Sequence, residues 1–61
     1  MNKEFLDTLL YKKVKIIRKN NFFNMGILIS FDEKGIYIND RRTGPLFIEF
    51  DDIKEMCGAK E

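Results

Sequence analysis

The sequence contains no histidine and a single cysteine, and these two shortages exclude several kinds of chemistry. Without histidine, no imidazole is present to act as a general base or to bind a metal ion. Cys57 cannot form an internal disulfide, and it lacks cysteine or histidine neighbours with the spacing of zinc ligands. We therefore expect neither a metal site nor a cofactor, and we expect Cys57 to be a partly buried apolar residue.

Long apolar runs and glycine-rich phosphate loops are missing as well. No apolar run reaches the roughly 18 residues that are needed to cross a bilayer. The opening segment has an acid on each side of its apolar pair, Phe5 and Leu6, which is not typical of a secretion signal. The acidic pairs at 32–33 and 51–52 fall in expected turns, where they cap or face solvent. We expect a cytoplasmic protein that is not an enzyme and does not bind membranes.

A chain of 61 residues has room for one domain, 1–61, which buries only about 60% of the surface of its unfolded chain. Hydrophobic residues make up 44% of the chain and charged residues 34%, which excludes intrinsic disorder. The residue patterns predict an N-terminal helix at 2–11, a barrel at 12–57 and a frayed tail at 58–61.

Gly26 interrupts an apolar run between residues 22 and 32 that is otherwise rich in strand-forming side chains. Glycine weakens a strand interior, so it is expected there only where the strand bends sharply or another backbone comes close. The position predicts a strongly bent strand in a small closed barrel. Asp32 ends the run, and we expect its side chain to accept hydrogen bonds from backbone amides of its own turn.

Apolar and polar residues alternate along the segments on either side of this run, as in half-buried strands. The pattern predicts a mainly β fold, in which a short helix precedes a strongly bent, five-stranded antiparallel barrel. The inward-facing residues should include Val14, Ile16, Ile36 and Ile38. The segment 39–45 is the longest expected loop and carries two arginines near its tip.

Charge and outward-facing apolar residues both indicate binding partners. Residues 1–30 carry six basic and two acidic side chains, whereas residues 31–61 carry five basic and eight acidic ones. Such polarity creates a face that attracts polyanions, although solvated faces that serve solubility give the same pattern. The outward apolar residues exceed what one short helix covers, so we expect a closed homo-oligomer. They are Ile17, Phe23, Met25, Ile27, Ile29 and Phe47.

Several stretches resemble the two motifs of the Sm and Sm-like family, which includes archaeal Sm-like proteins and bacterial Hfq. Leu10-Tyr-Lys-Lys-Val14, Gly26-Ile-Leu-Ile-Ser-Phe-Asp32 and Ile36-Tyr-Ile38 are similar to the first motif. Ile48-Glu-Phe-Asp-Asp-Ile53 is similar to the second in position and apolar spacing. The resemblance implies an SH3-like barrel of the Sm type, assembled as a hexameric or heptameric ring that binds RNA. In such a ring the fourth strand of one subunit pairs with the fifth of the next, which places the contact at Phe47, Ile48, Phe50 and Ile53.

The residues that read uridine in this family differ in this chain. Sm proteins have an asparagine where this chain has Ile36, and Hfq has an aromatic residue where it has Lys34. We therefore expect single-stranded RNA to be bound with weak base specificity, through phosphates and stacking. Phosphate contacts are expected from Lys12, Lys13, Lys15, Lys19, Lys34, Arg41 and Arg42, and stacking from Tyr37 and Phe22. The alternative is a protein-interaction module that uses the apolar outer face of the strand 22–31 and binds no nucleic acid.

Overall fold

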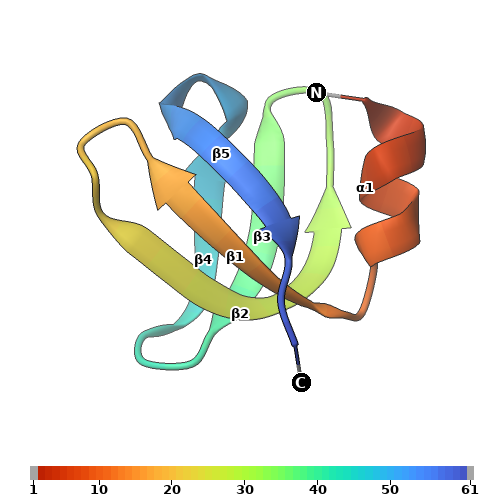
Figure 1. Ribbon diagram of the computed structural model, residues 1–61. Helices are drawn as coiled ribbons and strands as arrows, with labels where there is room; N and C mark the ends of the chain where they lie inside the picture. Colours follow the sequence, from red (N-terminus) through yellow and green to blue (C-terminus); the bar gives the residue numbers. More distant parts are fainter. Residues whose placement is uncertain (1, 61) are drawn as a thin grey trace.

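The computed structural model describes residues 2–60, in which a short helix is followed by five antiparallel strands of one sheet (Figure 1). The elements in chain order are α1 (Lys3–Leu9), β1 (Lys13–Arg18), β2 (Phe23–Phe31), β3 (Gly35–Asp40), β4 (Gly44–Glu49), the 3₁₀ helix η1 (Phe50–Asp52) and β5 (Ile53–Gly58). The strands lie in the order β4-β3-β2-β1-β5. The predicted mainly β fold, with one N-terminal helix and five antiparallel strands, is confirmed.

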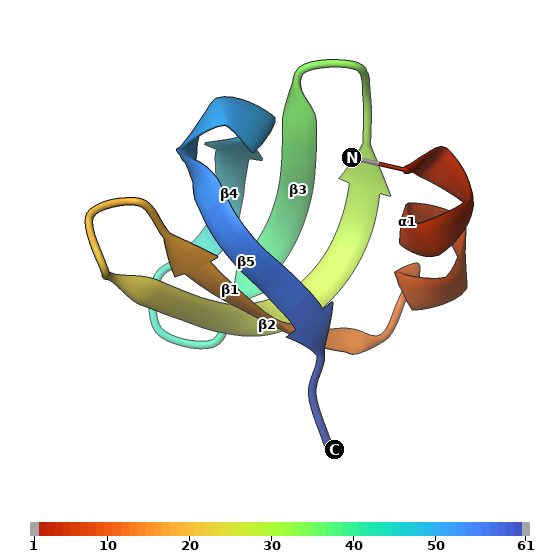
Figure 2. The same cartoon turned by 45° about the horizontal axis from the view of Figure 1, so that its top comes forward.

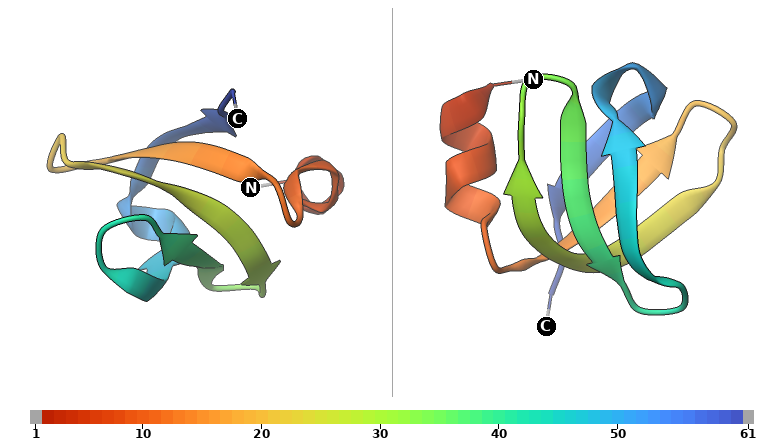
Figure 3. Two further views of the ribbon diagram at one scale, coloured as in Figure 1. Left: turned by 90° about the horizontal axis from the view of Figure 1, so that it is seen from below. Right: turned by 180° about the vertical axis from the view of Figure 1, so that it is seen from behind.

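The sheet curls round the core but stays open between its two edge strands. Figure 3 shows the half that contains β3 and β4 crossing in front of the half that contains β1 and β5. Within residues 2–60 no backbone pairing joins β4 to β5, so the expected closure of the barrel is wrong along this seam. An unpaired edge offers backbone N–H and C=O groups to another strand.

The side chain of Asn2 caps the start of helix α1, where the backbone amides of the first turn have no carbonyl partner within the helix. Its Oδ1 accepts hydrogen bonds from the backbone amides of Glu4 at 2.7 Å and Phe5 at 3.4 Å. Leu6 is the buried residue of α1, which therefore packs one face on the barrel. The helix ends two residues earlier than predicted. No helix in the residues that the structure describes is long and apolar enough to cross a membrane.

Strand β2 curves strongly enough to belong to both halves of the sheet (Figure 2). Residues 23–27 pair with β1, and residues 26–31 pair with β3. The register with β3 shifts between Leu28 and Ser30, where an extra residue increases the local bend and twist.

Gly26 lies where these two ladders overlap, and the neighbouring backbone of β3 leaves no room for a side chain. A Cβ on Gly26 would lie 2.8 Å from the carbonyl carbon of Asn39 and 2.9 Å from the Cα of Asp40. Both distances are shorter than real Cβ contacts. The close approach of a second backbone therefore requires glycine at this position. The shift in register between β2 and β3 lies further along the strand, between Leu28 and Ser30.

The core consists of the inward-facing side chains of every strand together with one helix residue. The alternation predicted for β1 and β3 is confirmed. The core residues are Leu6, Val14, Ile16, Leu28, Ile36, Ile38, Ile48 and Ile53. Burial of each such side chain stabilises the fold by about 1.5–3 kcal/mol.

Two residues predicted at the subunit contact belong to this core instead. Ile48 has no exposed surface and Ile53 only 8%, so their side chains are not available to another subunit. The physical reason is that an edge strand still turns alternate side chains inward, and only its backbone edge and outer face remain free. Phe47 faces outward with 37% of its surface exposed, and Phe50 is half-buried.

The connection between β3 and β4 differs from the sequence-based expectation. The loop between β3 and β4 has only three residues, 41–43, so the prediction of a long loop at 39–45 is wrong. The side chain of Asp40 tightens this turn by accepting hydrogen bonds from the backbone amides of Arg42 at 2.8 Å and Thr43 at 3.1 Å. The connection between β1 and β2 is longer, and Asn21 adopts the left-handed conformation there with φ of 69°.

The C-terminal segment is more ordered than predicted. Strand β5 continues to Gly58, and the backbone amide of Ala59 donates to the carbonyl of Lys13 at 2.9 Å. The expected frayed tail at 58–61 is thus wrong for its first two residues, and Glu61 lies outside the described residues. Cys57 is exposed rather than partly buried, because it faces outward on an edge strand opposite Lys15.

Candidate nucleic-acid interface

Basic and aromatic side chains meet on the outer face of β2 and the adjoining turn between β3 and β4. The Nζ of Lys15 lies 5.6 Å from the ring centroid of Phe23, which is a cation–π distance. Arg41 approaches Met25, with its Nη1 3.9 Å from Sδ. A cavity of about 290 Å³ is lined by Phe23, Met25, Asp40, Arg41 and Arg42. Phe22, in the β1–β2 connection, lines a second cavity with Phe23 and Arg42. We refer to Lys15, Phe22, Phe23, Met25, Arg41 and Arg42 as the basic–aromatic cluster.

Strand register and one short turn position this cluster. Met25 pairs with Lys15 across β1 and β2, and alternation places both side chains on the outer face. The backbone amide of Arg41 donates to the carbonyl of Met25 at 3.1 Å, which holds the β3–β4 turn against β2. Two arginines far from Met25 in the sequence are therefore brought beside it.

The two phenylalanines of the cluster are unusually accessible. Phe22 is 70% exposed and Phe23 is 53% exposed. The backbone of Phe22 is nevertheless held in place, because its carbonyl accepts from the amide of Arg18 at 2.7 Å and its own amide donates to Oδ1 of Asn20 at 3.0 Å. A fixed backbone with an exposed ring is a platform on which a flat ligand can stack.

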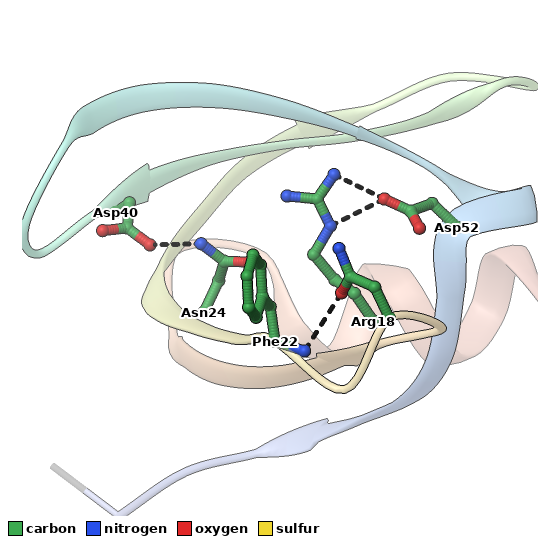
Figure 4. A network of polar contacts seen from close by, with 6 residues as sticks. Arg18, Phe22, Asn24, Asp40 and Asp52 are labelled. Atoms are coloured by element: carbon green, nitrogen blue, oxygen red, sulfur yellow. Dashed lines mark hydrogen bonds and ion pairs between the residues drawn. The ribbon is translucent and has the colours of Figure 1, made fainter.

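Beneath the cluster lie two polar contacts that the sequence did not reveal (Figure 4). Nδ2 of Asn24 donates to Oδ2 of Asp40 at 2.9 Å, and Nε of Arg18 donates to Oδ2 of Asp52 at 2.6 Å. Arg18 also forms an ion pair with Asp52 through Nη2. The first contact joins β2 to β3, and the second joins β1 to η1.

The hydrogen bond from Asn24 is the main reason that the pKa of Asp40 lies below its ordinary value. Backbone amides of Arg42 and Thr43 lower this pKa further, while burial opposes them by raising it. Asp40 is only 4% exposed, and the net result is an ionised carboxylate at neutral pH. This carboxylate holds the turn that carries the two arginines of the cluster.

The other residues predicted to bind RNA are distributed over the molecule. Lys34 lies in the β2–β3 turn, at the opposite end of the sheet from the β3–β4 turn (Figure 1). Lys12 and Lys13 lie beside the end of α1 and the C-terminal segment, where they line a separate cavity. Lys19 is exposed in the same loop as Phe22. The structure therefore brings together only part of the predicted set.

Tyr37 belongs to a different surface from the cluster. It lies on the outer face of β3 and packs on Phe47 of β4, with ring centroids 4.7 Å apart and planes tilted by 46°. Tyr37 remains 43% exposed, so the pair forms an apolar patch at the free β4 edge. Asp32 acts within its turn, where its Oδ1 accepts from the amides of Lys34 at 2.8 Å and Gly35 at 3.0 Å.

Sequence reasoning missed Asn24 and Asp40 as parts of a site. One signal for Asn24 was available, because it is a polar residue at an inward-facing position of a mostly apolar strand. No family model matches this chain, and a search of curated proteins finds no significant match.

Proposed function

We propose that this protein is a small Sm-like RNA-binding protein that assembles as a homo-oligomeric ring and binds single-stranded RNA through phosphate contacts and base stacking. The observation that carries the proposal is the basic–aromatic cluster, in which Lys15 and Arg41 lie beside the exposed ring of Phe23 and Arg42 lines a cavity with both Phe22 and Phe23. Cations neutralise phosphates, and a base of any sequence can stack on an exposed ring, at about 1–3 kcal/mol per base.

The cations of the cluster are available for phosphates. The ion pair within residues 2–60 is the one between Arg18 and Asp52, which lies beneath the cluster. Lys15, Arg41 and Arg42 form no ion pair in this part of the chain. The carboxylate of Asp40, which lines a cavity with Arg41 and Arg42, is engaged by Asn24 and by backbone amides of its own turn. Glu55 lines a cavity with Lys15 but forms no ion pair with it.

Ring assembly is supported by the two free edges of the sheet and by the apolar patch beside one of them. Pairing β4 of one copy with β5 of the next would satisfy both edges and bury part of Phe47. An interface that joins two different edges is heterologous, and it forms a ring when the rotation between copies closes. This support is independent of the cluster, because the patch and the cluster lie on different strands.

Native mass spectrometry, with and without short single-stranded RNA, tests both parts of the proposal. We expect a single closed oligomer of 7.3 kDa subunits that gains the mass of the oligonucleotide. A monomer of 7.3 kDa that retains no RNA would contradict the proposal.

The outer face of β2 favours a second candidate function, that of a protein-interaction module. Phe23 is 53% exposed and Ile29 is 44% exposed on this face, so it offers apolar area to a partner. The two candidates differ in their response to salt, because phosphate contacts weaken steeply as salt rises, whereas apolar contacts do not. Protein binding that persists in high salt, together with no RNA binding in low salt, would favour the module.

A further inference from the structure

Asn24 has a buried side-chain oxygen that lacks a hydrogen-bond partner. Its Oδ1 is shielded from solvent and meets no donor within residues 2–60. A buried acceptor without a donor is costly, so native proteins contain few of them and each calls for a physical reason. Asn24 stands in the middle of the polar contacts that hold the cluster, and it directly follows the two exposed phenylalanines in the sequence.

The neighbouring carboxylate fixes the orientation of this amide. Nδ2 of Asn24 donates to Asp40, and an ionised carboxylate can only accept hydrogen bonds. Turning the amide over would place its oxygen against the carboxylate oxygen, which is electrostatically unfavourable. Oδ1 is therefore a fixed acceptor on the side of Asn24 that faces away from Asp40.

A cavity adjoins Asn24 and is lined by both exposed phenylalanines. It measures about 360 Å³, within the range of small-ligand pockets. Its lining residues are Arg18, Asn21, Phe22, Phe23, Asn24 and Arg42. Figure 4 shows the ring of Phe22 drawn next to the Asn24 amide, and both residues line this cavity. Because Phe22 is 70% exposed, few protein contacts hold its ring.

We propose that this cavity receives an unpaired nucleobase that carries an exocyclic amino group, adenine, cytosine or guanine, and that the ring of Phe22 turns aside so that this amino group donates to Oδ1 of Asn24. The assignment rests on the proposed RNA-binding function and adds a base preference at one position. The base stacks on the ring of Phe22 or Phe23, while Arg42 at the same cavity faces the phosphate.

The chemistry of the four bases explains the preference. Adenine offers its N6 amino group, cytosine its N4 amino group and guanine its N2 amino group as donors. Uracil has a carbonyl oxygen where cytosine has the amino group, so two acceptors would face each other at Oδ1. Uracil keeps one donor on this edge, N3–H, but this group lies between two carbonyl oxygens. Uracil in this pocket would therefore either leave the buried acceptor unpaired or place a carbonyl oxygen against it, which is the source of discrimination in polar sites. The stretch of RNA outside the pocket is still held by phosphate contacts, so uracil-containing strands bind more weakly but do bind.

Fluorescence anisotropy with hexanucleotides tests the preference directly on the full-length protein. Each of two ligand pairs compares a base that has an exocyclic amino group with a similar base that lacks it. The first pair is oligocytidine and oligouridine, and the second is oligoadenosine and an oligomer of purine riboside, which lacks the N6 amino group. For each pair we expect the amino-bearing strand to bind at least about fivefold more tightly. In Asn24→Leu this ratio should fall to about one, while oligouridine keeps its affinity.

Two further variants keep the test decisive. Asn39→Leu makes the same chemical change at an exposed position of β3 and should retain the full ratio. If Asn24→Leu does not fold, Asn24→Thr replaces it, because a threonine hydroxyl can still donate to Asp40 while the amide oxygen is removed.

The outcomes separate this pocket from the proposed function. Binding of all four oligomers with equal affinity would overturn the pocket and leave RNA binding intact. Discrimination that survives in both Asn24 variants would also overturn it, because the preference would then arise elsewhere. Failure to bind any oligomer at low salt would overturn the proposed function together with the pocket.

Discussion

Gly26 of β2 pairs with Asp40 of β3 so closely that a Cβ on the glycine would lie 2.9 Å from the Cα of the aspartate. The same aspartate accepts the hydrogen bond from Asn24 and caps the turn that carries Arg41 and Arg42. The close approach of the two backbones therefore determines both the path of β2 and the position of the basic–aromatic cluster.

Replacing Gly26 by alanine should destabilise the protein clearly. The new Cβ meets backbone atoms of Asn39 and Asp40, which cannot move without disturbing the β2–β3 ladder. Overpacking of this kind costs about 1–3 kcal/mol, and each kcal/mol lowers the melting temperature of so small a domain by about 4–8 °C. Thermal unfolding followed by circular dichroism measures the effect.

Gly58→Ala is the matched control for this substitution. A Cβ on Gly58 would find its nearest neighbour, Cδ2 of Leu9, at 3.4 Å, which is an ordinary contact distance. Its melting temperature should stay within about 2 °C of the parent protein. Equal melting temperatures for the two variants would show that the β3 backbone yields easily, and that Gly26 is not required there.

The parts of the fold that follow from local pattern were predictable from the sequence. Alternation along β1 and β3 assigned Val14, Ile16, Ile36 and Ile38 to the core, because side-chain direction in a strand depends only on position parity. Gly26 was recognisable for the same kind of reason, since a glycine within a strand-forming run needs a steric cause.

Features that depend on register between distant segments were not predictable. The contact between Asn24 and Asp40 spans 16 residues and exists only because β2 and β3 pair with one particular offset. The loop at 39–45 was predicted too long because Gly44 and Pro45 are typical of turns. In the structure both residues pair with β3, and β4 tolerates Pro45 because an edge strand does not need every backbone N–H.

Acidification should remove the contribution of Asp40 to stability. Its pKa is lower in the folded protein than the ordinary value of 3.8 that applies to the unfolded chain. A carboxyl group shifted in this direction stabilises the fold above its unfolded pKa, and this stabilisation is lost as the pH falls through the folded pKa. The difference in melting temperature between the parent protein and Asp40→Asn should therefore be largest near neutral pH and shrink below about pH 4.

Asn24→Leu provides an intermediate case for the same measurement. It removes the strongest cause of the lowered pKa and leaves the backbone amides of Arg42 and Thr43 in place. As the pH is lowered, its melting temperature should fall less steeply than that of the parent protein and more steeply than that of Asp40→Asn. Parallel curves for all three proteins would mean that Asp40 does not couple proton binding to folding.

Substitutions on β4 should separate assembly from folding. Phe47→Asp places a charge in the exposed apolar patch beside the β4 edge, and we expect smaller particles in sedimentation velocity with an unchanged circular dichroism spectrum. Ile48→Asp buries the same charge in the core and should unfold the subunit. Arg41→Ala, in the β3–β4 turn and outside the apolar patch, should leave the oligomer intact. If Phe47→Asp sediments like the parent protein, the β4 edge is not part of the interface.

The salt dependence of RNA binding should arise from phosphate contacts made by the cluster and not from basic residues elsewhere on the protein. Removing Lys15 and Arg41 together by alanine substitution should lower the slope of log affinity against log salt by about 0.7 for each phosphate that the variant no longer neutralises. Neither residue lines the cavity beside Asn24, so the affinity ratio between oligocytidine and oligouridine should not change.

The double variant Lys34→Ala with Lys54→Ala is the matched control, because it removes the same amount of charge. Lys34 lies at the opposite end of the sheet, and Lys54 is exposed on β5, which does not pair with β2. Neither lysine lines the two cavities of the cluster. Anisotropy titrations at several salt concentrations should give this variant the slope of the parent protein. An equal fall in slope for both double variants would mean that RNA responds to the net charge of the barrel, and the basic–aromatic cluster would then lose its role as the interface.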